Sequence, residues 1–329
     1  MTATTKSTTQ LGPDARAWAA ENLKGFYMCP LTPLTDDFEL DEEGLRHNID
    51  AFVEMGCAGL VVGGFFAEGW NMTLAEWRRY HEVVADAAAG RLPLFTIILE
   101  SSAYQAIEKM HYVESLGFTG AEIMNPSVQL KTDDDVVSYF DFVASKTGLA
   151  LVLYRTPVSG FVYSHDAVLR IAEHSNVIGV KNGTLSWTDS IALRRRAGDR
   201  LVISEPNERY WAHDAALFGG RVLYGELSLL LYGKWRSDLH RYTDLALAGD
   251  LEKALPLSEK LDPIRQVYDE VLIGRIAATG SYVAAMPYLK AWFELLDLRA
   301  GPMRPPVAAR LSAAERDLLG QQLEAAGAI

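Results

Sequence analysis

Lys181 is the residue of this sequence whose surroundings point most directly to chemistry. It closes a run of apolar and small residues, Val177-Ile178-Gly179-Val180, and the turn residues Asn182-Gly183 follow it. A short run of this kind, bounded by a turn, is typical of a strand buried on both faces. Burial disfavours the charged form of an amine, and a neutral amine can attack a carbonyl group to form a Schiff base. The simpler alternative is a lysine whose charged end reaches into water.

Tyr154 ends an earlier apolar run in the same manner. Side chains alternate along a strand, so Val152 and Tyr154 share one face, and Gly179 and Lys181 share one face of the next strand. If both faces point inward, a phenol and an amine meet, and the phenol can move protons while a carbinolamine forms or a C–C bond breaks. The alternative for Tyr154 is a core residue whose hydroxyl group is satisfied by the backbone.

The elements that must position these two residues alternate regularly between strand and helix. Apolar runs predict eight strands, at residues 25–31, 59–63, 94–99, 120–124, 149–154, 177–181, 201–204 and 221–225. Helical patterns precede or follow them, at residues 13–23, 41–55, 73–89, 104–116, 132–145, 165–174, 187–197, before Phe218, and as one long helix after the last strand. Eight such units predict a parallel (β/α)₈ barrel.

Three regions are expected along the chain. Residues 1–24 form an N-terminal tail and a short helix, and Met1 to Gln10 lack the apolar core of a signal peptide. Residues 25–250 form the barrel. Residues 251–329 show only helical patterns and are expected to form about three helices, broken at Gly301-Pro302 and Pro305-Pro306, that pack on the barrel as an extension.

Barrel enzymes place their active sites where strands end and the following loops begin. The predicted catalytic residues there are Lys181 and Tyr154. Other strand ends supply further polar or aromatic residues, among them Asn71, Glu100 and Glu205. From these strand ends we take as substrate-binding candidates Gly64, Phe65, Phe66, Glu68, Asn125 and Tyr224.

Composition narrows the function classes. The chain has 329 residues, 49% of them hydrophobic and 22% charged, and a net charge of −12. A nucleic-acid-binding protein usually has a basic footprint, which this sequence lacks. Its apolar runs are shorter than the ~18 residues of a membrane span. Two cysteines and seven scattered histidines indicate neither a disulfide framework nor a metal site. We therefore expect a soluble cytoplasmic protein without a metal or cofactor, whose partner is a small carbonyl compound.

Several motifs together resemble the dihydrodipicolinate synthase / N-acetylneuraminate lyase family of class I aldolases. The motifs are Pro30-Leu31-Thr32-Pro33, Tyr154-Arg155-Thr156-Pro157-Val158-Ser159-Gly160, Gly179-Val180-Lys181, Gly219-Gly220 and Gly301-Pro302-Met303-Arg304-Pro305-Pro306. The resemblance extends from about Gly25 to Gly327. It implies a barrel, a Schiff-base lysine at Lys181, a proton-shuttling tyrosine at Tyr154, no metal, and a homo-oligomer, usually a tetramer, with a dimer as the other option.

Two stretches depart from the family pattern. Synthases of the family often carry a tyrosine after the proline of the fourth strand end, whereas here Ser127-Val128 follow Pro126. The family typically carries Gly-Thr-Thr-Gly-Glu after the second strand, with the threonines holding a keto-acid carboxylate, whereas this chain reads Gly64-Phe65-Phe66-Ala67-Glu68. Hydratase-aldolases of the family also show one phenylalanine at such a position. A bulky or aromatic substrate part is therefore predicted. The alternative is that both rings pack beneath the helix that starts at Thr73. A second function hypothesis is a non-catalytic barrel that binds a small apolar or aromatic ligand; the joint presence of Lys181 and Tyr154 favours the lyase.

Overall fold

The protein has eight strands arranged as in a (β/α)₈ barrel, as a computed structural model shows for residues 14–329. The strands are β1 (Gly25–Met28), β2 (Gly59–Val62), β3 (Leu94–Ile98), β4 (Gly120–Met124), β5 (Ala150–Arg155), β6 (Val177–Asn182), β7 (Val202–Ser204) and β8 (Val222–Glu226). Their hydrogen-bonded order is β7-β6-β5-β4-β3-β2-β1-β8. The predicted fold class is confirmed, although the first strand ends three residues earlier than expected. The predicted tail at residues 1–10 lies outside the described residues.

The elements group into two compact units. The first unit comprises the described residues up to Leu23 together with Pro93–Ser204, and it contains β3 to β7. The second comprises Lys24–Leu92 and Glu205–Ile329, with β1, β2 and β8. The division predicted from the sequence, with a boundary near residue 250, remains a prediction.

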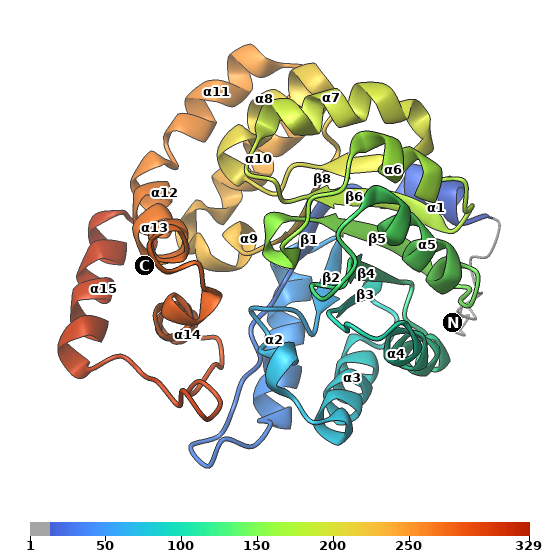
Figure 1. Cartoon of the computed structure of the whole chain (residues 1–329). Coiled ribbons are helices and arrows are strands. Elements are labelled where there is room, and N and C mark those ends of the chain that lie inside the picture. Colours follow the sequence, from blue (N-terminus) through green and yellow to red (C-terminus); the bar gives the residue numbers. More distant parts are fainter. Residues whose placement is uncertain (1–13) are drawn as a thin grey trace, which may run out of the picture. The chain divides into compact units, whose positions relative to one another are not determined.

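Figure 1 shows the strands and helices of the first unit. Its helices are α1 (Ala15–Asn22), α4 (Ala103–Ser115), α5 (Asp133–Ala144), α6 (His165–Ile171) and α7 (Trp187–Ala197). Every one of these helices except the first begins with a side-chain cap. α5 begins with a capping box in which Thr132 and Asp135 bond each other's backbone N–H groups. The acidic run Asp133-Asp134-Asp135 lies in its first turn, where negative charge complements the helix dipole.

The register of the strands in the first unit arranges inward-facing residues in layers, because residues paired across parallel strands point to the same side. One layer contains Ile97, Glu122, Val152 and Gly179 from β3 to β6. The next layer, nearer the carboxyl ends of the strands, contains Met124, Tyr154, Lys181 and Ser204 from β4 to β7. The predicted shared face of Tyr154 and Lys181 is thus confirmed, and Glu122 lies one layer below them.

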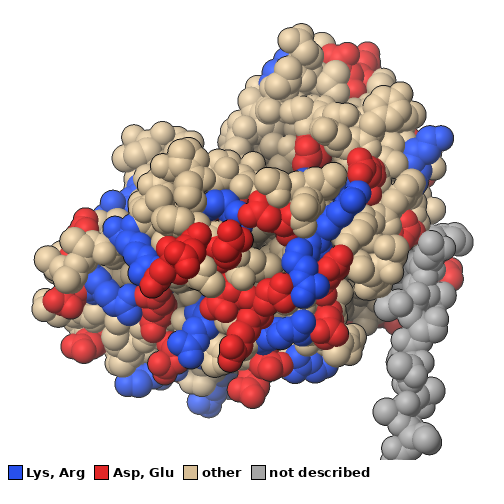
Figure 2. Space-filling view, turned by 90° about the horizontal axis from the view of Figure 1, so that it is seen from below, with Lys and Arg blue, Asp and Glu red and all other residues tan. Residues whose placement is uncertain are grey.

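The second unit contains the helix pair α2 (Glu42–Glu54) and α3 (Leu74–Ala88). Thr73 and Glu76 form a capping box at the start of α3. Ion pairs such as Arg46–Asp86 and Arg79–Glu42 join the two helices, and their side chains are well exposed. On the face drawn in Figure 2, acidic and basic side chains alternate over much of the surface.

The helices after β8 differ from the prediction. The single long helix expected there is divided into α9 (Ser228–Leu231), a 3₁₀ turn (Gly233–Trp235) and α10 (Arg236–Leu247). Five helices follow instead of about three, drawn in orange to red in Figure 1: α11 (Leu251–Glu259), α12 (Asp262–Tyr268), α13 (Gly274–Thr279), α14 (Met286–Leu295) and α15 (Ala313–Ala325). Gly280 ends α13 with a φ of 68°, and Pro287 lies in the first turn of α14, so these breaks have local causes.

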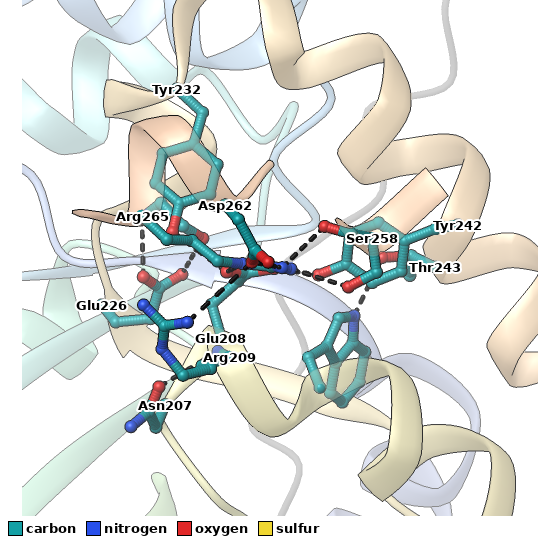
Figure 3. A network of polar contacts seen from close by, with 12 residues as sticks. Asn207, Glu208, Arg209, Glu226, Tyr232, Tyr242, Thr243, Ser258, Asp262 and Arg265 are labelled. Carbon is teal, nitrogen blue, oxygen red and sulfur yellow. Dashed lines mark hydrogen bonds and ion pairs between the residues drawn. The ribbon is translucent and has the colours of Figure 1, made fainter. Parts of the chain in front are cut away.

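A buried ion pair connects these later helices to the loop after β7 (Figure 3). Arg265 of α12 donates from Nε and Nη2 to the two carboxylate oxygens of Glu208, at 2.9 and 2.8 Å. The hydroxyl groups of Tyr232 and Tyr242 donate to the same carboxylate. Both charged side chains are at most 5% exposed. Four donors on one carboxylate satisfy a charge that would otherwise be costly to bury.

Among residues 14–329, no helix combines the length and the apolar character that crossing a membrane requires. Over the same residues, His, Cys, Asp and Glu side chains form no group of three or more that could hold a metal ion. Cys29 and Cys57 are both buried and are not joined in a disulfide.

Candidate active site

Lys181 and Tyr154 form the centre of the candidate active site. They are direct partners in the ladder between β5 and β6, near the carboxyl ends of both strands. Lys181 Nζ lies 4.5 Å from the centroid of the Tyr154 ring. Lys181 is 7% exposed and Tyr154 is 4% exposed. The two strand ends therefore bring together an amine and a phenol in a nearly dry environment.

The outward-facing residues of the same strand ends fix the geometry of this pair. Arg155 donates to Asn182 and to Asp189 of α7, at 2.9 and 2.6 Å, and to the carbonyl oxygen of Tyr163 at 2.7 Å. Burial alone raises the pKa of Asp189, but the hydrogen bond from Asn182 and the charge of Arg155 lower it below its ordinary value. Because Arg155 and Asn182 face the helices, Tyr154 and Lys181 face the opposite side of the strands.

Gly183 leaves space for the tyrosine ring. A Cβ atom at this position would lie 3.0 Å from Cε2 of Tyr154. The residues after Tyr154 also have a defined local structure, because Thr156 caps a 3₁₀ turn that begins at Pro157. The family-like motif around Tyr154 is therefore a strand end followed by a capped turn, which holds the phenol beside Lys181.

Glu122 belongs to this site, although sequence reasoning did not identify it. Its Oε1 lies 3.7 Å from Lys181 Nζ, and its side chain is fully buried. Burial raises the pKa of Glu122, and the positive charge of Lys181 opposes this only in part. The available signal was a single charged residue in the middle of the apolar run Gly120-Ala121-Glu122-Ile123-Met124.

Asn125 follows directly after β4 and is fully buried. Its Nδ2 donates to the carbonyl oxygen of Phe161 at 3.3 Å, whereas its Oδ1 has no hydrogen-bond partner among the described residues. The amide nitrogen of Asn125 is thus hydrogen-bonded, and its side-chain oxygen can accept a hydrogen bond from a bound molecule. Its role in substrate binding remains a prediction.

The stretch after β2, in the second unit, places its two phenylalanines against one tyrosine. The Phe65 ring stacks on Tyr282 at 5.1 Å between ring centroids, and Phe66 meets the same ring edge to face at 5.2 Å. The turn itself is tight, because Gly69 N–H donates to Gly64 O at 3.0 Å and a Cβ at Gly69 would lie 1.9 Å from Gly63 O. Tyr282, which the sequence analysis did not single out, completes an aromatic cluster with Phe65 and Phe66.

Glu68 is engaged by the C-terminal part of the same unit. Its Oε2 accepts from the backbone N–H of Arg304 at 2.8 Å, and its Oε1 lies 3.2 Å from Lys290 Nζ. Lys290 also donates to the carbonyl oxygens of Thr32 and Ala300. Glu68 has a left-handed backbone conformation, with φ 55°, and is 1% exposed. These contacts give Glu68 a structural task at the turn; its predicted contact with substrate stays a prediction.

Tyr224 and Glu226 lie on β8. Tyr224 pairs with Tyr27 of β1 in the ladder, and their rings stack with 5.8 Å between centroids. Glu226, at the end of the strand, accepts from the backbone N–H groups of Leu227 and Ser228 and from the Ser228 hydroxyl group. Burial raises the pKa of Glu226 to about 7. The sequence analysis did not identify Glu226.

A (β/α)₈ barrel with a buried lysine against a tyrosine at adjacent strand ends defines the class of lyases that work through a lysine Schiff base. The family model of the dihydrodipicolinate synthetase family matches residues 22–326. The chain belongs to this family, whose members are class I lyases, and it is an enzyme of that class. Membership favours the lyase hypothesis over the non-catalytic barrel.

Individual relatives are distant. The chain is 24% identical over 285 residues to an N-acetylneuraminate lyase of Rhizobium meliloti (strain 1021), covering 86% of this chain and 89% of the relative. It is also 24% identical over 294 residues to a 4-hydroxy-tetrahydrodipicolinate synthase of Methanopyrus kandleri, covering 87% and 90%. These relatives agree with the family match over residues 22–326 and leave the substrate open.

Solved structures share the fold. A chloride inhibited dihydrodipicolinate synthase from Acinetobacter baumannii, complexed with pyruvate, superposes with a TM-score of 0.79 at 20% identity, covering 93% of this chain and all of that chain (100%). PhdJ bound to a substrate intermediate superposes with a TM-score of 0.79 at 20% identity, covering 97% of this chain and 98% of that chain. The barrel and the helices after it are therefore shared features.

Proposed function

We propose that this enzyme is a Schiff-base aldolase, hydratase-aldolase or dehydratase that acts on a 2-oxo acid, or a related carbonyl compound, with a bulky or aromatic part. The observation that carries the proposal is the pair of Lys181 and Tyr154, with Nζ 4.5 Å from the ring centroid. Lys181 is the nucleophile, and Tyr154 moves protons. Both residues match the family motifs in type and order.

The chemistry follows from these two groups. The neutral amine of Lys181 attacks the carbonyl carbon, and the carbonyl π electrons move to oxygen, which gives a carbinolamine. Loss of water then leaves an iminium ion, which withdraws electrons from the adjacent C–C bond. Cleavage or formation of that bond, or loss of a leaving group, proceeds from this state. Tyr154 donates to and accepts from the oxygen and carbon atoms as they gain and lose protons.

The aromatic part of the substrate is proposed from the stretch after β2. Where the family carries two hydroxyl side chains, this chain has Phe65 and Phe66. Aromatic rings recognise other rings by stacking and edge contacts, and they supply no hydrogen-bond donors for a carboxylate. Backbone N–H groups of the Gly64 turn are the proposed carboxylate donors in place of the missing threonines. Tyr282 supports the two rings and thereby sets their orientation.

Borohydride trapping with a panel of 2-oxo acids, from pyruvate to aryl-substituted keto acids, tests the proposal. A substrate that forms the Schiff base adds a fixed mass to the peptide that contains Lys181, and Lys181→Ala abolishes the adduct. Lys290 is the internal control, because it is also deeply buried and its Nζ is engaged by Glu68, Thr32 and Ala300. An adduct on Lys290, or no adduct with any member of the panel, would refute the assignment.

A further inference from the structure

Glu122 is a buried carboxyl group that the proposed mechanism has not yet used. It lies in the layer directly below Lys181, and neither of its oxygens has a hydrogen-bond partner within residues 14–329. The neighbouring layer position on β6 is Gly179, which has no side chain, so nothing on that strand separates the carboxyl group from the lysine above it. Lys181 Nζ lies 3.7 Å from Oε1, which is close enough for a proton to pass after a small movement.

The surroundings make an ion pair at this position unfavourable. A buried carboxylate normally needs several hydrogen bonds, as Glu208 and Glu226 have in this same protein. Among residues 14–329, Glu122 has only the 3.7 Å contact with Lys181, and the residues beside it in its layer, Ile97 and Val152, are apolar. The pair of Glu122 and Lys181 can shed both charges by moving one proton from nitrogen to oxygen, and low polarity favours that neutral form.

The titratable groups that face Glu122 from the strands beside it are few. On β3 the same face carries Ile97, on β5 it carries Val152 and Tyr154, and on β6 it carries Gly179 and Lys181. Arg155 and Asp189 belong to the network on the other side of the strands. The proton equilibrium of Glu122 is therefore coupled to Lys181 first and to Tyr154 second.

We propose that Glu122 is a further catalytic acid and base of this enzyme, which exchanges a proton with Lys181 Nζ during Schiff-base formation. This inference rests on the proposed function of Lys181. The carboxylate first takes one proton from the lysine ammonium group, which leaves a neutral amine and a carboxylic acid. The amine attacks the carbonyl carbon, and a proton moves from nitrogen to oxygen to give the neutral carbinolamine.

The same proton completes the step. When the carbinolamine loses its hydroxyl group, the nitrogen lone pair forms the C=N bond, and the Glu122 proton leaves with the hydroxyl group as water. An iminium cation then stands opposite a Glu122 carboxylate. The net charge of the pair is zero before and after the step, so the interior never holds an uncompensated charge. The observed burial, which raises the pKa of Glu122, suits a group that carries a proton until this point.

Reductive methylation with formaldehyde and cyanoborohydride tests this inference without the natural substrate, because formaldehyde forms a carbinolamine and an iminium ion with any accessible amine. The rate of methylation at Lys181 is measured by peptide mass, with Lys253, 74% exposed, as the internal reference. In Glu122→Gln we expect the Lys181 rate to fall roughly tenfold to a hundredfold at pH 7 to 8. Lys253 keeps its rate, and Glu108→Gln, an exposed glutamate on α4, is the matched control.

Two further measurements make the result decisive. Glu122→Asp keeps a carboxyl group and is expected to restore part of the rate. In the native protein, the methylation rate of Lys181 is expected to fall at alkaline pH, because the pair loses its shared proton. This decrease, the alkaline limb of the pH profile, is expected to be absent in Glu122→Gln. Equal Lys181 rates and equal pH profiles in the native protein and Glu122→Gln overturn the inference. If Glu122→Gln does not fold, absence of the alkaline limb in the native protein overturns it. If no 2-oxo acid of the borohydride panel forms an adduct, that result counts against the proposed function and not against this inference.

Discussion

Lys181 Nζ faces the ring of Tyr154 at 4.5 Å from its centroid. The electron-rich face of an aromatic ring attracts a cation, and the attraction is stronger where water is excluded. The nitrogen of an iminium ion carries positive charge. The ring of Tyr154 can therefore stabilise the proposed intermediate, and its hydroxyl group is proposed to transfer protons. These two roles of one side chain can be separated by substitution.

Tyr154→Phe keeps the ring and removes the hydroxyl group. We expect kcat to fall by roughly a hundredfold or more, with a much smaller change in KM, because proton transfer acts in the transition state. Trapping with borohydride should persist, since the amine is still present. Tyr163→Phe is the matched control, because Tyr163 is a buried tyrosine of the same unit whose hydroxyl group has no hydrogen-bond partner in the described part of the chain. An unchanged kcat in Tyr154→Phe would reduce Tyr154 to a packing residue.

Replacing both Phe65 and Phe66 by threonine should shift the substrate preference from aryl-substituted keto acids toward pyruvate. An aromatic pair contributes about 0.5–1.5 kcal/mol, so we expect kcat/KM for an aryl substrate to fall roughly tenfold, while small keto acids gain. The panel is measured on the native protein, on the double variant and on Phe142→Thr, which changes a partly exposed ring on α5. If the native protein prefers pyruvate and the double variant gains nothing for it, the aromatic-substrate proposal is wrong.

Arg265→Met removes one member of the buried ion pair and leaves Glu208 with a buried charge. Such a break typically costs about 3–5 kcal/mol in the free energy of unfolding. Arg209→Met is the control, because Arg209 is 42% exposed and its pairs with Asp262 and Asp269 are at the surface, where a pair contributes about 0–1 kcal/mol. Urea unfolding of both variants measures the difference. Equal losses in the two variants would show that the buried network contributes no more than a surface pair.

The carboxyl group of Glu226 should make stability depend on pH. Its pKa is raised to about 7 in the folded protein, whereas the ordinary value is 4.5. Between these pH values the folded state binds the proton and the unfolded state does not. The contribution of Glu226 to the free energy of unfolding is therefore fully present at low pH and is lost as pH rises through about 7. From pH 5 to pH 8 this loss amounts to roughly 2–3 kcal/mol.

Glu226→Gln has no carboxyl group to ionise, so comparison with this variant isolates the contribution of Glu226 to the pH dependence of stability. Urea unfolding at pH 5, 6, 7 and 8 gives the free energy of unfolding of the native protein and the variant. We expect the difference between them to change in favour of the variant as pH rises, because other groups titrate alike in both. A difference that stays constant across this range would mean that Glu226 ionises at its ordinary pKa.

The central pair of the site was predictable because its signals are local. The alternation of side chains along one strand places Tyr154 and Lys181 on given faces, and the turn residues behind them mark the strand ends. Glu122 was not predictable in the same way. The run around it shows a charged residue inside a strand, but only the register of β4 with β5 and of β5 with β6 reveals that it lies below Lys181.

Longer-range contacts and irregular breaks account for the remaining differences. Glu208 and Arg265 are 57 residues apart in the sequence, and no local pattern near either residue predicts that they pair. The helices after residue 250 were undercounted although local signals existed, because Gly280 and Pro287 act as an end and a start within a continuous helical pattern. Only part of the aromatic cluster could be predicted from the sequence. Phe65 and Phe66 depart from a family motif, whereas no motif draws attention to Tyr282.

The contact between Glu208 and Arg265 has a consequence for cooperativity. The carboxylate belongs to the loop after β7, and two of its four donors come from α12, beyond residue 250. A chain cut after α10 would keep this carboxylate and lose the guanidinium group that neutralises it. The later helices therefore neutralise the buried charge of the turn that carries Glu208, within the second unit. They are expected to melt together with this turn in a single transition, so that a proteolytic cut in this region would abolish the fold of the second unit rather than trim it.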